Sequence, residues 1–237
     1  MICIFGGTAA YHLTPADFGD AETLPQLDTP FGPAPIFLKL NAGEVLFSSR
    51  HGADKLARSA AFVNHRANLW AAKEYGATAI LSWNGVGAIN SLLAVGDKLV
   101  PDDLIDATRG REAASFQPPV TPPLKGVFWE AGRAALIESA APALPRGVYV
   151  CTEGPRLETP AEIATFAQMG ADVVGMTLVP EVFLADEMNL PYASLCIVTN
   201  IAAGLATQSS PRRFGPEVAR EGLAACQRGH GRGHRRT

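Results

Sequence analysis

The second half of the chain alternates between short apolar runs and segments whose apolar residues follow helical spacing. The runs at 147–152, 171–175 and 192–198 have the length and composition of buried strands. The segments between them, 160–169 and 180–188, predict helices. Repetition of strand, helix and strand predicts one α/β domain with a mixed, largely parallel β-sheet flanked by helices.

The first half of the chain continues this alternation with less regular spacing. Two apolar runs, 35–40 and 44–49, flank an Asn–Ala–Gly turn and predict a hairpin. Four prolines within 117–125 exclude a regular element there and predict a loop. The remaining predictions are a strand at 2–5, a helix at 62–75, a strand at 77–83, an extended segment at 99–105 and a helix at 129–140.

The length and composition suit a single domain with a sizeable core, because 47% of the 237 residues are hydrophobic. We assign this domain to residues 1–226, in which 216–226 forms a helix of about three turns. Residues 227–237 are rich in Gly, His and Arg and lack apolar periodicity. They predict a disordered basic tail.

Several classes of partner are disfavoured by the composition. A formal net charge of -3 argues against nucleic-acid binding. The first residues carry neither a basic leader nor a long apolar segment, so we expect no signal peptide and no membrane partner. The four cysteines form no CxxC pair, which suggests reduced thiols and a cytoplasmic protein. Cysteine and histidine spacing predicts no metal site.

Three glycine-rich or polar clusters follow predicted strands, at 6–8, 48–52 and 84–87. Ligands of α/β sheets gather at such strand ends. Exposed backbone N–H groups, hydroxyls and one arginine are suited to hold a small oxyanion. Each cluster alone is better explained as a turn or a solvated strand end, and their combination makes an anion site an equally good explanation.

Three further polar segments, 153–159, 175–177 and 199–200, also follow predicted strands. Structural explanations exist for each of them. Thr159 and Glu162 fit a helix capping box, Glu181 could complement a helix N-terminus, and Asn200 could be a turn residue.

Two long runs, 147–163 and 170–200, resemble the second half of trimeric purine nucleoside phosphorylases. The motifs at 49–52 and 63–77 are similar to the methylthioadenosine phosphorylase branch of that family. Within the family, the PRLET motif, the Asn after the last strand and the segment 104–112 are most similar to the S-methyl-5'-thioinosine phosphorylase subgroup. The resemblance covers roughly residues 1–205 and implies the nucleoside phosphorylase fold.

The resemblance implies phosphorolysis of a purine nucleoside, in which inorganic phosphate is a co-substrate and no other cofactor is needed. It assigns phosphate binding to six residues and the ribose to Met176, which could otherwise be core filler. Catalysis then rests on position and charge compensation rather than on a base that activates phosphate. The phosphate residues are Thr8, Arg50, His51, Asn84, Gly85 and Thr177.

The resemblance also assigns the purine to Glu158 and Asn200. Asn200 can donate to a 6-oxo group and accept from N7–H, whereas adenosine-specific relatives carry Asp. Glu158 can accept from N1–H, a proton that adenine lacks. A site built to accept a hydrogen bond from N1–H discriminates against a base that lacks this proton by ~10⁴ or more in favourable cases. Together these residues predict a 6-oxopurine, with S-methyl-5'-thioinosine as the first choice of substrate.

The 5' end of the substrate is less constrained. Phe214 aligns with a 5'-pocket residue of the family and suits a methylthio group, but it could equally be a surface residue. Alternatives are a purine nucleoside phosphorylase acting on inosine or guanosine, a methylthioadenosine phosphorylase, and an inactive relative that only binds nucleosides. The family also implies a homotrimer.

Two departures from the family pattern affect the site. The loop at 117–127 lacks the His that relatives often carry there. His65 replaces a common Tyr, either as a conservative aromatic exchange or as a surface change.

Overall fold

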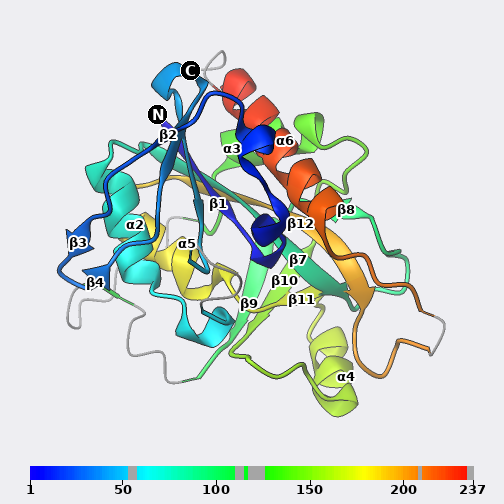
Figure 1. The fold of residues 1–237 in the computed structure, drawn as a ribbon. Helices are drawn as coiled ribbons and strands as arrows, with labels where there is room; N and C mark the ends of the chain where they lie inside the picture. Colours follow the sequence, from blue (N-terminus) through cyan, green and yellow to red (C-terminus); the bar gives the residue numbers. More distant parts are fainter. Residues whose placement is uncertain (53–57, 110–114, 117–125, 208–209, 234–237) are drawn as a thin grey trace.

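The computed structural model describes residues 1–237 except 53–57, 110–114, 117–125, 208–209 and 234–237. A large mixed sheet runs through the molecule, with helices on both of its faces (Figure 1). The predicted α/β fold with a mixed, largely parallel sheet is therefore confirmed. The strands are β1 (Ile2–Gly6), β2 (Glu22–Thr23), β3 (Asp28–Thr29), β4 (Gly32–Pro33), β5 (Leu38–Leu40), β6 (Val45–Ser49), β7 (Ala79–Ala88), β8 (Lys98–Leu99), β9 (Asp103–Ala107), β10 (Val148–Thr152), β11 (Val173–Gly175) and β12 (Tyr192–Ile201).

The sheet is organised around two long parallel strands, β7 and β12. The path of the sheet is β2-β5-β6-β1-β7-β11-β10-β9, and β12 pairs with β7 and β8. β1 is parallel to both β6 and β7, so the ends of these strands lie at one edge. The predicted hairpin is confirmed as the antiparallel pair β5 and β6.

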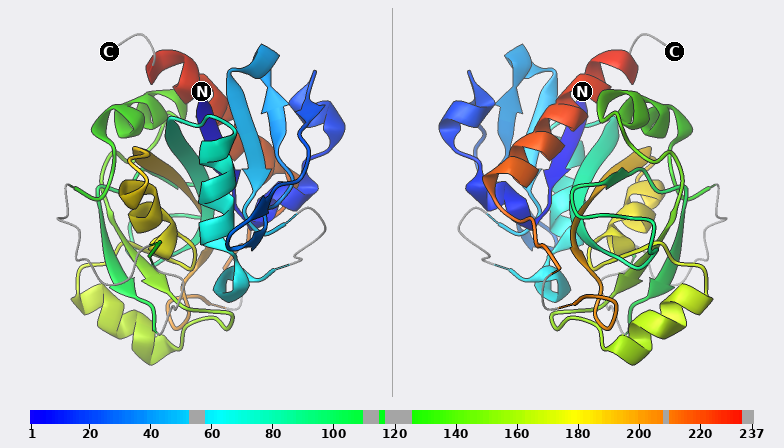
Figure 2. Two further views of the ribbon diagram at one scale, coloured as in Figure 1. Left: turned by 90° about the vertical axis from the view of Figure 1, so that its left-hand side faces the viewer. Right: turned by 90° about the vertical axis from the view of Figure 1, so that its right-hand side faces the viewer.

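The described residues form six α-helices, four of which cover the sheet as two pairs. They are α1 (Pro15–Phe18), α2 (His65–Glu74), α3 (Glu130–Ser139), α4 (Pro160–Gln168), α5 (Leu178–Glu187) and α6 (Pro216–Gly233), with short 3-10 turns η1 (Thr8–His12), η2 (Asn41–Gly43) and η3 (Ala60–Phe62). α2 packs with α5 on one face, and α3 packs with α6 on the other (Figure 2). Two apolar cores result, one beneath each pair.

The predicted disordered tail is wrong for residues 227–233, because α6 continues to Gly233. Polar side chains hold this extension of α6 in place, so a search for apolar residues at helical spacing does not reveal it. The guanidinium of Arg228 donates to the carbonyl oxygen of Ser139 (Nη2–O 3.0 Å), and His230 is buried. A Cβ on Gly222 would lie 2.4 Å from Trp83, so only glycine lets α6 approach β7 this closely.

Some sequence predictions lie outside the described residues. They include the proline-rich loop at 117–125 and residues 110–112 of the segment shared with the S-methyl-5'-thioinosine phosphorylase subgroup. Within the part of the chain that is described, no helix is both long and apolar enough to cross a membrane.

Candidate active site

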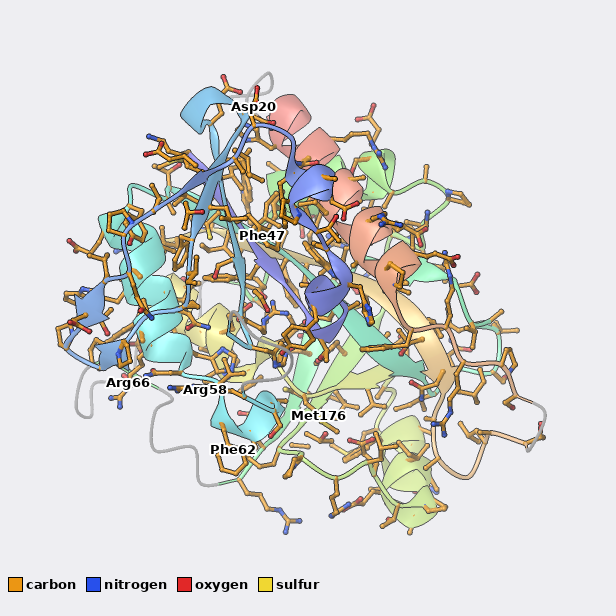
Figure 3. The ribbon with its side chains drawn as sticks, in the orientation of Figure 1. Asp20, Phe47, Arg58, Phe62, Arg66 and Met176 are labelled. Atoms are coloured by element: carbon orange, nitrogen blue, oxygen red, sulfur yellow. The ribbon has the colours of Figure 1, made fainter. Side chains whose placement is uncertain are left out.

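Residues at the ends of β1, β7, β11 and β12 line a cavity of about 300 Å³. Met176, at the end of β11, lies below the sheet between the strands and α4 (Figure 3). Nine of the ten predicted site residues line this one cavity although they come from distant parts of the chain. They are Thr8, His51, Asn84, Gly85, Glu158, Met176, Thr177, Asn200 and Phe214.

Thr8 and His51 form a hydrogen-bonded pair at the cavity wall. Thr8 Oγ1 lies 3.4 Å from His51 Nε2, and His51 Nδ1 lies 3.0 Å from the carbonyl oxygen of Arg58. A carbonyl oxygen only accepts, so Nδ1 carries the proton and Nε2 presents a lone pair. Burial, assisted by the charge of Arg50, lowers the pKa of His51 to about 4. The imidazole is therefore neutral at pH 7.

Arg50 is the tenth predicted residue, and it lies behind the cavity wall. Its buried guanidinium donates from Nε and Nη2 to both carboxylate oxygens of Glu181, at 2.8 and 2.7 Å. Nη1 donates to Asn84 Oδ1 at 3.0 Å and to the carbonyl oxygen of Trp83 at 3.2 Å. Burial alone lowers the pKa of Arg50, but the adjacent Glu181 carboxylate outweighs burial and raises it above the ordinary value. Arg50 thus carries a permanent charge.

Asn84, Gly85 and Thr177 shape the same end of the cavity. Asn84 Oδ1 also accepts from the hydroxyl of Thr177 at 2.7 Å, and Asn84 Nδ2 donates to Ser194 Oγ at 2.6 Å. The amide is thus oriented by a donor on one side and an acceptor on the other. A Cβ on Gly85 would lie 3.0 Å from the methyl group of Thr199, so glycine keeps this wall open.

Glu158 and Asn200 also line the cavity, and each accepts a hydrogen bond from a neighbouring hydroxyl. Thr152 Oγ1 donates to Glu158 Oε1 at 2.6 Å, and Thr199 Oγ1 donates to Asn200 Oδ1 at 3.0 Å. Asn200 Nδ2 donates to the Ile201 carbonyl oxygen at 3.0 Å. The β7–β12 register shifts between residues 198 and 200, which marks a β-bulge beside this amide.

Phe214 lines the cavity and is 56% exposed, so the structure accommodates both of the alternatives left open for it. Its ring makes an edge contact with His12, with centroids 6.3 Å apart. Apolar side chains continue this part of the wall, namely Val86, Ile201, Ala202, Ala203 and Ala206.

Ser82, Ser194 and Tyr149 support the site and were missed from the sequence. Ser82 and Ser194 occupy apolar runs, and the position of a hydroxyl within an otherwise apolar strand was the available signal. The hydroxyl of Tyr149 accepts from the backbone N–H of Thr177 at 3.4 Å. His65 is 2% exposed and its Nδ1 lies 3.3 Å from Glu181 Oε2, so the interpretation as a surface change is wrong.

A second cavity of about 410 Å³ shares Glu158 and extends along α4. Charged side chains of both signs line it, among them Arg109, Glu153 and Arg156. Across the described residues, no group of three or more His, Cys, Asp or Glu side chains is arranged to hold a metal ion.

The fold and the cavity together define a class, the nucleoside phosphorylases. The model of the Phosphorylase superfamily matches residues 2–228. The probable S-methyl-5'-thioinosine phosphorylase of Methanothermobacter thermautotrophicus is 42% identical over 210 residues, which cover 86% of this chain and 73% of that protein. The 6-oxopurine nucleoside phosphorylase of Pyrococcus furiosus is 38% identical, with 86% and 80% covered.

Among solved structures, the methylthioadenosine phosphorylase of Schistosoma mansoni in complex with tubercidin superposes with a TM-score of 0.83 at 29% identity. The superposition covers 97% of this chain and 89% of that one. The chain belongs to the Phosphorylase superfamily.

Proposed function

We propose that this protein catalyses phosphorolysis of a 6-oxopurine nucleoside, and that S-methyl-5'-thioinosine is its substrate. The products are hypoxanthine and 5-methylthioribose 1-phosphate, so the enzyme is a pentosyltransferase of purine salvage. The observation that carries this proposal is that one cavity is lined by hydroxyl, imidazole and amide groups suited to phosphate together with Glu158 and Asn200, which are suited to a 6-oxopurine.

Phosphate binds at the end formed by Thr8, His51, Asn84, Gly85 and Thr177. On phosphate binding, the hydroxyls of Thr8 and Thr177 turn their protons from His51 and Asn84 to the phosphate oxygens, and the backbone N–H of Gly85 donates as well. The neutral His51 can then accept from a protonated phosphate oxygen. The permanent charge of Arg50 lies directly behind this wall and stabilises the anion. A phosphate oxygen then bonds to C1' of the sugar as the C1'–N9 bond breaks.

The purine leaves with the electron pair of the broken bond, and the proton that hydrogen phosphate loses as the ester forms ends on the purine to give hypoxanthine. Asn200 stabilises it by hydrogen bonds at N7 and the 6-oxo group, and Glu158 accepts from N1–H. Met176, which lines the same cavity, packs against the sugar. The site thereby holds both reactants in line and stabilises charge at each end of the breaking bond, without another cofactor.

The ring of Phe214 offers a 5'-methylthio group an apolar contact, which favours it over a hydroxyl. A purine nucleoside phosphorylase acting on inosine or guanosine is the second candidate. It is favoured by relatives named 6-oxopurine nucleoside phosphorylase, such as that of Pyrococcus furiosus. Asn200 in place of Asp argues against a methylthioadenosine phosphorylase.

Homotrimeric assembly and a cytoplasmic location are further parts of this proposal. The first rests on family resemblance. The second rests on four free cysteines, all of them buried.

The test is a coupled assay of base release from methylthioinosine, inosine and methylthioadenosine, each with and without phosphate. We expect phosphate-dependent release in the order methylthioinosine, inosine, methylthioadenosine. An inosine preference would favour the second candidate. Binding of nucleosides without any turnover would identify an inactive relative instead.

A further inference from the structure

Glu181 is a fully buried carboxylate to which the proposed reaction assigns no role. It lies on α5, its side chain is 0% exposed, and the residues that line the cavity do not include it. Both of its oxygens accept from Arg50, and Oε1 also accepts from the hydroxyl of Tyr192 at 2.7 Å. Nδ1 of His65 lies 3.3 Å from Oε2.

Burial raises the pKa of Glu181, but the neighbouring Arg50 charge and hydrogen bonds outweigh burial and hold it below the ordinary value. The carboxylate is therefore charged at neutral pH. A buried ion pair is seldom a net source of stability compared with apolar residues of similar volume. Its position in the fold therefore suggests a role beyond stability.

The ion pair is connected to the cavity wall by short contacts. Arg50 Nη1 donates to the carbonyl oxygen of Trp83 and to the side-chain oxygen of Asn84. The same Asn84 oxygen accepts from Thr177, and both of these side chains line the cavity. A Cβ on Gly7, which also lines the cavity, would lie 3.5 Å from Arg50 Nη1.

A second route returns from Asn84 to Glu181 and closes a ring. Asn84 Nδ2 donates to Ser194 Oγ, which lies 2.8 Å from Ser82 Oγ. Ser82 Oγ lies 2.8 Å from the Tyr192 hydroxyl, which donates to Glu181. The ring joins α5, β7, β12 and the residue after β6, so it couples the helix to the strand ends that form the wall.

A carboxylate can only accept hydrogen bonds, so Glu181 determines which way its neighbours point. Arg50 must aim Nε and Nη2 at it, and this leaves Nη1 for Asn84. The Asn84 oxygen then faces Arg50 and Thr177, while its amide nitrogen faces Ser194. Arg50 only donates, so it draws the Asn84 oxygen towards itself, and Glu181 determines which Arg50 nitrogen is left to do so.

We propose that Glu181 is a positioning residue for the phosphate end of the cavity, which it organises through Arg50, Asn84 and Thr177. The inference rests on the proposed phosphorolysis. Glu181 does not touch either reactant; it sets the geometry of the groups that bind phosphate. Its loss weakens phosphate binding and leaves the purine end unchanged.

The decisive variant is Glu181→Gln, which keeps the shape of the side chain. Because Arg50 donates to both carboxylate oxygens, either orientation of the new amide places an NH2 group against an Arg50 N–H. We expect the phosphate KM to rise about tenfold or more, as one charge-assisted hydrogen bond is lost. The nucleoside KM should stay within about twofold.

Tyr192→Phe is the milder variant in case Glu181→Gln does not fold. It removes one donor to Glu181 without touching Arg50, and we expect the phosphate KM to rise about threefold. Arg133→Met is the matched control. Arg133 is a buried arginine of α3 that donates to the carbonyl oxygens of Pro101 and Pro145, and none of these three residues lines the cavity. This control should lower Tm and leave both KM values unchanged.

Both KM values and Tm are measured for the wild type and all three variants. The positioning role is wrong if the wild type is active but the Glu181 and Tyr192 variants raise both KM values equally or lower only Tm. A wild type that releases no base with phosphate present would instead refute the proposed function.

Discussion

Replacing Asn200 by aspartate tests how the enzyme chooses its base. Asn200 Nδ2 is the donor assigned to the 6-oxo group, and Thr199 holds the other amide atom by donating to Oδ1. Asn200→Asp removes that donor and sets a carboxylate oxygen against the oxygen of the substrate. An unsatisfied pair of acceptors costs about 1–3 kcal/mol, and a new hydrogen bond from a 6-amino group to a carboxylate contributes about 1.5–3 kcal/mol.

Together these effects shift the preference by about 3 kcal/mol, or about 100-fold in the ratio of kcat/KM for methylthioinosine over methylthioadenosine. Glu158 still faces the unprotonated N1 of adenine, so the variant need not prefer the 6-amino substrate outright. Steady-state kinetics with both nucleosides at saturating phosphate measures the ratio. Asn189→Asp introduces the same charge at an exposed position and should leave it unchanged. If Asn200→Asp retains the parent ratio within about threefold, the explanation of base choice is wrong.

Three further changes address the rest of the site. Arg50→Ala should raise the phosphate KM more than tenfold and lower Tm, because Glu181 is left buried without its partner, at a cost of about 3–5 kcal/mol; equal effects on both KM values would contradict this. The pKa of His51 is about 4 when folded and 6.5 when unfolded, so the unfolded chain binds more protons between these values. Stability should therefore fall by about 3 kcal/mol as the pH drops from 6.5 to 4. If urea unfolding of His51→Gln shows the same dependence of stability on pH as the wild type, His51 is not the cause. Phe214→Ser should lower kcat/KM for methylthioinosine about threefold to tenfold relative to inosine, since a partly exposed ring contributes only part of its apolar surface; an unchanged ratio would place Phe214 outside the 5' pocket.

Local sequence patterns were sufficient where the physical cause is local. The capping box of α4 forms as predicted, with Thr159 N–H donating to Glu162 Oε2 and Glu162 N–H donating to Thr159 Oγ1. The clusters at strand ends were also informative. Thr8 follows β1, which is parallel to the β7 strand that carries Asn84, so these two residues meet although they are far apart in sequence. Thr177 follows β11, which pairs antiparallel with β7 and reaches the same cavity.

Long-range packing could not be deduced in the same way. The continuation of α6 to Gly233 depends on contacts with α3 and β7, which no periodicity within residues 227–233 encodes. The ring through Ser82, Ser194, Tyr192 and Glu181 was equally hidden, because each of its members has an ordinary local role. Only the pairing of β7 with β12 brings these hydroxyls together.

The central claim is that phosphate and a 6-oxopurine nucleoside react within one cavity. Phosphorus NMR of the protein incubated with methylthioinosine and inorganic phosphate tests it most directly. The account predicts a new sugar phosphate ester signal that grows in step with hypoxanthine. Release of hypoxanthine at the same rate without phosphate, and with no ester formed, would contradict it.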